Sequence, residues 1–520
     1  MRLPVIFAAL VSTSVNVSVA LDVNGWYPCG PTTKPRAGDG NGDVPEASFA
    51  VGDKPKFECA QVTMPLCHDG LCKSEPGESI PIFGGPSMPS TGLEAPMFAA
   101  YKEFNSTVGI YTMDHSGTGR SHFLQCQAAQ VDTDGSESSV GVTAAEMAAC
   151  LHDLNFQYKN KAAAFSITSA ATDLKKLLQG LLPDHDVFVQ GLSYGTAVVQ
   201  RLVQLQPPSV KGFIFEGVNA LPTQDKTTQT QWSRADVLTL GPARRLLEAC
   251  FDDLKCPLKF QSRATVVSDV LALFNKLDAE VETNLCSQLL LGDIYLKPSD
   301  NLRSLLGTLV GTGVLNDLVY LPLVLAKLKT CTPDDLNVIK PIVDALSDQT
   351  LSEASSTNKT TSTHHRFLIE RRLQAASQLQ TMDTLRDSNG LLYDLIVSSE
   401  LYGPTSPTFA YARDKYWGTS LTLPKNASAL LLTGGLDFAT PAEHGEILLK
   451  KLDGGRGKLL VIFKYGDHCR GEATRGSLMM SCHNAIIKQF VLAGGDVAKI
   501  DQSRLVSAPK VVFPAAYVPV

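Results

Sequence analysis

Gly191-Leu192-Ser193-Tyr194-Gly195 carries more structural information than any other part of this sequence. It follows the apolar run Val187-Phe188-Val189 and precedes Thr196-Ala197-Val198-Val199-Gln200-Arg201-Leu202-Val203, which has the pattern of a helix start. A strand, G-x-S-x-G and a helix in this order predict a nucleophile elbow. There a serine is held on a strained turn, and small neighbours let the strand and the helix approach closely. The pentapeptide alone occurs readily by chance, so its flanks give it its meaning.

Length and composition are those of a folded protein with a sizeable core. The 520 residues exceed one ordinary domain, but an α/β core that carries a large insertion accommodates them. Hydrophobic residues make up 44% of the chain and charged residues 19%, which is ordinary for globular proteins. The net charge of −6 offers no electrostatic attraction to a phosphate backbone, so we expect no nucleic-acid partner.

The N-terminus has the pattern of a secretory signal peptide over residues 1–20. A positive end at Met1-Arg2 is followed by apolar residues 3–11 and the small-x-small motif Ser18-Val19-Ala20. The apolar stretch is too short to cross a bilayer, and no later run of the sequence is long and apolar enough. We therefore expect a secreted, extracellular protein without stable membrane insertion.

Twelve cysteines agree with an oxidising compartment. Three short separations suggest disulfides, although spacing alone leaves the pairing open: Cys67–Cys72, Cys250–Cys256 and Cys469–Cys482. No C-x-x-C spacing occurs, so we expect no metal and no cofactor. Three N-glycosylation acceptor patterns also fit secretion: those at Asn105, Asn358 and Asn426.

Apolar periodicity divides the chain after the signal peptide into five parts. Residues 21–75 are rich in Cys, Gly and Pro, which is typical of a disulfide-tied, loop-rich segment. Residues 76–222 alternate short apolar runs with helical patterns, the signature of a mostly parallel sheet. Residues 223–400 have helical spacing and few strand signals, and the α/β pattern resumes over 401–505 before a tail at 506–520. We predict an α/β core, split by an inserted and mainly helical cap.

The same patterns predict individual elements. Expected strands are 80–83, 108–113, 187–190, 212–216, 429–433 and 459–463. Expected core helices are 144–156, 169–182, 442–452 and 476–493. In the cap, helical spacing covers 237–254, 266–281, 302–328 and 336–346.

A catalytic serine needs a base to accept its proton and an acid to hold that base in the right tautomer. On an α/β-hydrolase core the order along the chain is Ser, then Asp or Glu, then His, with the partners on loops after late strands. Asp437 stands just after the expected strand 429–433, and His468 just after 459–463. We therefore predict Ser193, Asp437 and His468 as a catalytic triad.

Each partner of the serine has an alternative interpretation. Asp437 also fits a turn or a helix cap before Thr440-Pro441. The rivals for the roles of base and acid are His115, His444 and Asp467. The first precedes the serine in the chain, the second lies within a helical pattern, and the third is adjacent to the predicted base and so would face it poorly. Chain order and placement at strand ends favour the predicted triad.

Acyl transfer also needs backbone N–H groups aimed at the developing oxyanion. One is predicted to be the amide of Tyr194, directly after the serine. The other is expected from Gly84 or Gly85 in Phe83-Gly84-Gly85-Pro86-Ser87, because glycine allows a close backbone approach. A plain Gly-Pro turn is the alternative.

In four segments the sequence resembles the prolyl aminopeptidase and tripeptidyl aminopeptidase-like serine peptidases of the α/β-hydrolase fold. FGGPS from Phe83 resembles the family's HGGPG loop, and DHSGTGRS from Asp114 its DQRGTGRS turn. GLSYGT from Gly191 resembles its nucleophile elbow, and GLDFATP from Gly435 its D-x-x-TP around the catalytic aspartate. Around the predicted base, Gly466-Asp467-His468-Cys469 departs from the usual G-x-G-H-G. Such departures leave the triad intact and concern the shape of the acyl pocket.

The resemblance implies a serine peptidase that releases residues or short peptides from free N-termini. A helical cap would restrict access, and a cap carboxylate would bind the substrate ammonium. The candidate carboxylates are Glu248, Asp252, Asp253, Glu280 and Glu282, each of which also fits a solvated helix face. The residues themselves leave open an esterase or lipase with the same triad, and a secreted binding protein without catalysis. The oligomeric state is not indicated.

Overall fold

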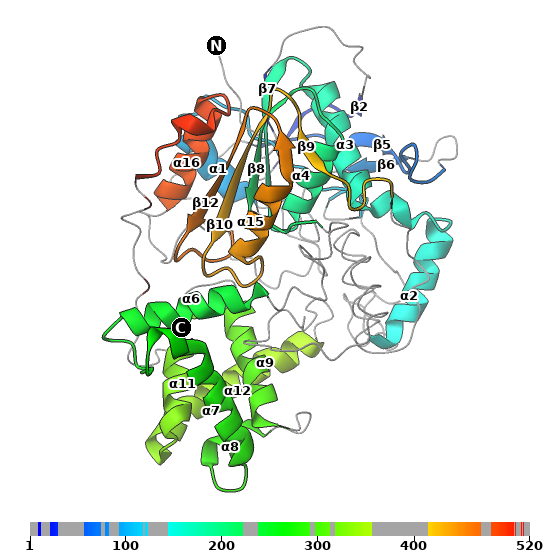
Figure 1. Ribbon diagram of the computed structural model, residues 1–520. Coiled ribbons are helices and arrows are strands. Elements are labelled where there is room, and N and C mark those ends of the chain that lie inside the picture. Colours follow the sequence, from blue (N-terminus) through cyan, green and yellow to red (C-terminus); the bar gives the residue numbers. More distant parts are fainter. Residues whose placement is uncertain are drawn as a thin grey trace.

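A computed structural model of the chain describes residues 9–11, 21–29, 57–73, 79–82, 93–117, 120–122, 144–221, 238–291, 297–311, 318–355, 414–469, 480–503, 505, 511 and 513. Figure 1 shows a sheet flanked by helices, with a separate group of helices below it. The sheet with its flanking helices is called the core, and the separate group the cap.

The central sheet has the strand order β1-β7-β8-β10-β12. Its four parallel strands are β7 (His185–Leu192), β8 (Val210–Glu216), β10 (Ser428–Gly434) and β12 (Gly457–Phe463). They confirm the expected strands 187–190, 212–216, 429–433 and 459–463. The short β1 (Ala9–Val11) pairs antiparallel with β7 and lies inside the expected signal peptide, so removal of that peptide would leave the four parallel strands.

Helices cover both faces of this sheet (Figure 1). On one side lie α1 (Glu94–Glu103) and α16 (Met480–Leu492), and on the other α3 (Ile167–Leu181) and α4 (Gly195–Gln204). The expected core helices are confirmed by α3 and α16 together with α2 (Ala144–Gln157) and α15 (Ala442–Lys451). Short elements complete this part of the molecule: β9 (Leu421–Leu423), β11 (Leu452–Gly454), η2 (Ala162–Phe165) and η5 (Val497–Lys499).

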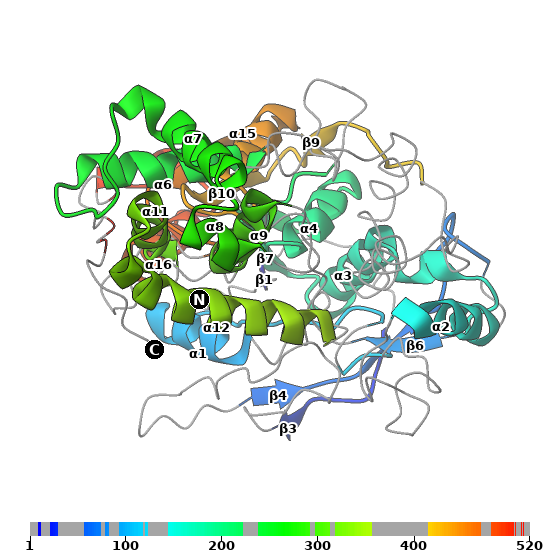
Figure 2. The same ribbon diagram turned by 90° about the horizontal axis from the view of Figure 1, so that it is seen from below.

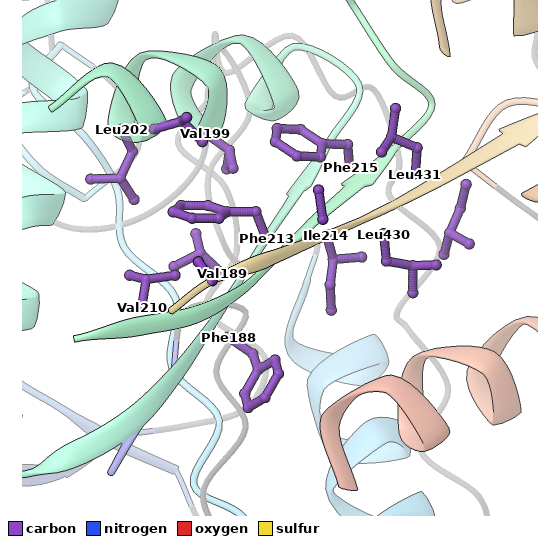
Figure 3. Packing of buried hydrophobic residues seen from close by; sticks show 14 of the residues in the cluster. Phe188, Val189, Val199, Leu202, Val210, Phe213, Ile214, Phe215, Leu430 and Leu431 are labelled. Atoms are coloured by element: carbon purple, nitrogen blue, oxygen red, sulfur yellow. The ribbon is translucent and has the colours of Figure 1, made fainter. Parts of the chain in front are cut away.

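Apolar side chains fill the space between the sheet and its helices. In Figure 3, Phe213 lies beside Val199 and Leu202 of α4, whereas Phe188 points to the opposite side of the sheet. There the Phe188 ring meets Phe490 of α16 edge-on, with 5.7 Å between the ring centroids. Alternate residues of each strand thus serve opposite faces, as a sheet buried on both sides requires.

Two small sheets form the Cys/Gly/Pro-rich N-terminal part. One pairs β2 (Asp22–Val23), β5 (Val62–Pro65) and β6 (Ser79–Ile82), and the other pairs β3 (Tyr27–Cys29) with β4 (Phe57–Cys59). The disulfide Cys29–Cys59 joins β3 to β4.

The expected strand 80–83 is confirmed as a strand but lies outside the central sheet, and the expected strand 108–113 is wrong. Residues 80–82 belong to β6, which pairs antiparallel with β5 in the small sheet, and residue 83 lies outside the described residues. Residues 108–113 form no strand. Their apolar pattern has a different cause, because Val108 is buried in the core and Ile110, Tyr111 and Met113 pack against it. An apolar run records burial and cannot show which backbone, if any, it pairs with.

The cap is helical, as predicted. It comprises α6 (Leu240–Asp252), η3 (Arg263–Thr265), α7 (Val266–Ala279), α8 (Leu285–Leu290), α9 (Pro298–Gly311), α11 (Leu321–Thr330) and α12 (Pro333–Ser355). Seen from below in Figure 2, these helices gather on one side of the molecule, away from α2. They enclose a second apolar cluster, which also contains Val511 and Phe513 from the expected tail.

The connectivity is that of an α/β-hydrolase core. A parallel sheet is covered on both faces, a serine stands at the turn from β7 to α4, and a helical cap is inserted between β8 and β10. In the part of the chain that the structure describes, no helix is long and apolar enough to span a membrane.

Disulfides tie both the N-terminal part and the cap. The suggested pairs Cys67–Cys72 and Cys250–Cys256 are confirmed, Cys286–Cys331 links α8 to the end of α11, and Cys150 is also disulfide-bonded. The suggested pair Cys469–Cys482 is wrong, because Cys469 carries a free thiol. Sequence separation could not reveal that the Cys469 Sγ lies 3.6 Å from the carbonyl oxygen of Glu216. Two glycosylation acceptors, Asn105 and Asn426, are exposed, and Asn358 lies outside the described residues.

Candidate active site

Ser193 occupies a strained turn between β7 and α4. Its φ of 52° lies in the left-handed region that non-glycine residues rarely adopt. The Ser193 N–H donates to the Glu216 carbonyl at the end of β8 (2.8 Å), and the Ser193 carbonyl accepts from Thr196 N–H (2.9 Å) in the first turn of α4. A Cβ added to Gly191 would lie 2.4 Å from the Gly195 carbonyl oxygen. The strand and the helix are therefore as close as a nucleophile elbow requires.

Asp437 lies just beyond β10, and its side chain is completely buried. Its Oδ1 accepts from the Thr440 N–H and its Oδ2 from the Thr440 hydroxyl, both at 2.7 Å. The same Oδ2 lies 2.9 Å from His468 Nδ1. Asp437 thus has both expected roles. It accepts from Thr440 within the turn, and it contacts the histidine with the same side chain.

His468 follows β12 and faces Asp437 through Nδ1. A carboxylate only accepts, so Nδ1 carries the proton of this bond and Nε2 is left as the basic nitrogen. Burial by itself would lower the pKa of His468, but the charge and hydrogen bond of Asp437, together with those of the neighbouring Cys469, outweigh that effect and raise the pKa well above 6.5. The pair is arranged to hold one tautomer and to stabilise an imidazolium.

The carbonyl of Glu216 connects the serine turn to the histidine loop. It accepts from the Ser193 N–H and lies 3.6 Å from the Cys469 Sγ, which is itself 3.7 Å from His468 Nε2. Gly217, at a φ of 58°, leaves room there, because an added Cβ would meet the Cys469 Sγ at 2.5 Å. Ser193 and His468 are both among the described residues, and no hydrogen bond joins the Ser193 hydroxyl to the His468 ring. The thiol stands beside the nitrogen that a serine nucleophile would use.

The predicted oxyanion donors are only partly described. Tyr194 is the N-cap residue of α4, so its amide belongs to the positive end of that helix, where N–H groups favour negative charge. Gly84 and Gly85 lie outside the described residues.

The rival histidines are engaged elsewhere. His115 is buried, its Nδ1 lies 3.1 Å from the Ser116 carbonyl, and burial lowers its pKa to about 4. His444 is buried in α15, where its Nδ1 accepts from the Ala220 N–H at 3.3 Å. The carboxylate that contacts His468 Nδ1 is that of Asp437. The rival acid Asp467 precedes His468 in the sequence, and its side chain is buried.

A second buried carboxylate, that of Glu216, lies at the end of β8. Gln190 Nε2 donates to its Oε2 (2.6 Å), and His483 Nε2 lies 3.0 Å from its Oε1. Together with Cys469, Glu216 and His483 line a small cavity at the ends of the strands. This pair was not predicted, because the two residues stand far apart in the chain and neither belongs to a recognisable motif.

Two further residues of the site were also missed. The D-x-x-T spacing of Asp437 and Thr440 does carry a signal, since an aspartate often accepts from backbone and hydroxyl groups of the next turn residues. For Cys469 the sequence suggested a disulfide and did not indicate a thiol beside the base.

Of the cap acids named from the sequence, Glu248, Asp252 and Glu280 form side-chain interactions at the surface, and Asp253 accepts from the Lys255 N–H at 2.9 Å. Glu248 and Asp252 both pair with Arg263, at 2.7 and 2.5 Å. Glu280 lies 3.8 Å from the Lys276 ammonium and accepts from Asn284 at 3.0 Å. These contacts fit solvated helix faces, and they assign no acid to a substrate ammonium.

Comparison with known proteins adds little to this geometry. No protein-family model matches the chain, and neither does any curated protein. One solved structure to which it is similar comes from work on novel epoxide hydrolases of the alpha/beta hydrolase superfamily in metagenomes from hot environments. The match covers 74% of this chain and 88% of that one, with 12% identity and a TM-score of 0.25. A likeness this weak carries no argument about the reaction.

Proposed function

We propose that the protein is a secreted serine hydrolase that acts through an acyl-enzyme on Ser193. The observation that carries the proposal is the contact of the partly exposed His468 with the buried Asp437 (2.9 Å), in a loop linked through the Glu216 carbonyl to a serine on a strained strand-to-helix turn. Such a turn holds the hydroxyl exposed at the strand end, and the pair supplies an oriented base. The disulfides fit secretion, because an oxidising compartment preserves them.

In the proposed reaction, the Ser193 hydroxyl attacks the substrate carbonyl while His468 Nε2 takes its proton. Asp437 holds the resulting imidazolium through Nδ1, and the Tyr194 N–H donates to the oxyanion. The imidazolium then protonates the leaving group, and a water molecule, activated by the same nitrogen, releases the acyl group. The hydrogen bond from the Ser193 hydroxyl to His468 Nε2 is part of this proposal.

Within this class we propose a peptidase that acts on free N-termini and whose cap limits access to the site. The proposal follows from the four sequence segments that resemble aminopeptidases, and no cap acid is assigned to the substrate amine. An esterase with the same triad is the competing enzyme class.

A fluorophosphonate probe tests the proposed nucleophile. Tested in buffers from about pH 5 to 8, it should label the wild-type protein most strongly at the alkaline end, where His468 is neutral, and leave Ser193→Ala unlabelled, because only an activated serine reacts. Absence of Ser193-dependent labelling across that range would favour a binding protein without catalysis. Aminoacyl- and peptidyl-coumarin substrates, compared with nitrophenyl acyl esters, then separate the enzyme classes: ester turnover without peptide release contradicts the peptidase.

A further inference from the structure

A cap arginine reaches the loop that carries the proposed catalytic acid. Arg245 of α6 donates from Nε to the Gly435 carbonyl at 2.5 Å, two residues before Asp437. Its Nη1 and Nη2 donate to the two carboxylate oxygens of Glu443 in α15, at 2.8 and 3.1 Å. All three nitrogens of one cap side chain are thus bonded to the core, and Figure 1 shows α6 as the cap helix beside the end of the sheet.

The same loop is also anchored in the apolar interior of the cap. Leu436 and Phe438, on either side of Asp437, are 2% and 4% exposed and belong to the cap's apolar cluster. Tyr465, in the loop before His468, packs against that cluster as well. The side chain of Asp437 turns instead to His468, so the cap holds the neighbours of the acid while the acid itself faces the base.

The acid loop is bonded in turn to the histidine loop. Gly435 N–H donates to the Phe463 carbonyl and Leu436 N–H to the Gly466 carbonyl, both at 2.8 Å. An added Cβ on Gly435 would come within 2.3 Å of the Lys464 carbonyl oxygen, so the two backbones are in close contact. A displacement of Gly435 would therefore move the acid relative to His468.

We propose that Arg245 is a positioning residue, through which the docked cap holds Asp437 against His468. The inference rests on the proposed triad. The competing explanation is an ordinary, partly exposed ion pair that only fastens the cap and contributes little to stability. The two explanations differ in what the loss of Arg245 changes: the ionisation and rate of the site, or the stability of the cap alone.

Arg245→Ala is the test variant, and Arg263→Ala is its matched control. Arg263 also contacts two carboxylates, but both belong to α6 of the cap itself. We expect Arg245→Ala to lower kcat roughly 10- to 100-fold with KM changed less than about threefold, because misplacement of a catalytic group affects mainly the chemical step. The acidic limb of kcat/KM should move to lower pH as His468 loses part of its carboxylate contact. Arg245→Lys should recover part of kcat, and Arg263→Ala should leave both quantities unchanged.

A spectroscopic readout keeps this test separate from that of the proposed reaction. The downfield Nδ1–H proton of His468, recorded by NMR, reports its bond to Asp437 without any turnover. We expect this resonance in the wild type and in Arg263→Ala, and its loss or broadening in Arg245→Ala. A folded Arg245→Ala that keeps the wild-type resonance overturns the inference, and so does one with wild-type kcat and pH limb. Should that variant fail to fold, Glu443→Gln, which loosens the Arg245 anchor and keeps the side-chain shape, is judged by the same criteria. Should wild-type Ser193 prove unreactive, the resonance alone decides.

Discussion

At the scale of single residues, Asp437 sets the pH range in which His468 can act as a base. The imidazole accepts a proton only in its neutral form, and the carboxylate at 2.9 Å favours the charged form. With the pKa of His468 held above 6.5, the base is progressively lost as the pH falls through that raised value. The proposed hydrolase is therefore expected to work best at neutral to alkaline pH.

The measurement is the pH dependence of kcat/KM in the wild type and in Asp437→Asn. We expect the wild-type acidic limb to have an apparent pKa above 6.5. In Asp437→Asn the limb should shift to lower pH and kcat should fall roughly 10⁴-fold, because the amide stabilises neither the imidazolium nor the required tautomer. Asp467→Asn, in the neighbouring acid, is the control and should leave the position of the limb unchanged. A limb that moves with Asp467 instead would assign the acid to the wrong residue.

At the scale of elements, the two glycines of the elbow differ in what they allow. A Cβ on Gly191 would strike the backbone at the start of α4, 2.4 Å from the Gly195 oxygen and 2.8 Å from Thr196 N. A Cβ on Gly195 would meet nothing within 4 Å. The G-x-S-x-G pattern therefore combines one glycine required by close packing with one that the packing does not require.

Paired substitutions test this difference between strand and helix. Gly191→Ala should destabilise the fold by about 1–3 kcal/mol, because backbone atoms must shift to admit the methyl group. Gly195→Ala should change the free energy of unfolding by less than about 1 kcal/mol, and a gain is expected from its lower unfolded-state entropy. Urea unfolding of both variants measures the contrast. Equal destabilisation would show that the approach of β7 and α4 is not the constraint.

At the scale of the whole molecule, the C-terminal tail joins the core to the cap. Val511 and Phe513 follow the core helix α16, yet both are buried in the cap's apolar cluster. The cap is therefore joined to the core through Arg245 of α6 and through this tail. A chain segment that returns to the cap lowers its freedom to move relative to the sheet.

Phe513→Ala tests the contribution of the tail. The ring is 3% exposed, and its removal should cost about 3–5 kcal/mol, in line with other buried phenylalanines. Hydrogen exchange should rise first in α7 and α11, whose apolar residues share the cluster. Phe156→Ala, at an 81% exposed position of α2, is the control and should stay within about 0.5 kcal/mol of the wild type. Unchanged exchange in the cap would mean that the tail does not support it.

Local patterns in the sequence predicted the parallel strands, the helical cap and the Asp437–His468 pair. This was possible because apolar periodicity records which faces are buried, and the ends of parallel strands necessarily meet at one edge of the sheet. The elbow serine, the acid and the base each follow such a strand. Their order along the chain was therefore enough to predict the contact between Asp437 and His468.

Contacts between distant segments depended on the packing of the folded chain. The sheet to which residues 80–82 belong, the free thiol of Cys469 beside His468, and the bond from Arg245 to Gly435 all join parts that no periodic pattern connects. The physical reason is that such contacts depend on the three-dimensional complementarity of whole surfaces, whereas a sequence pattern records only the environment of one segment at a time.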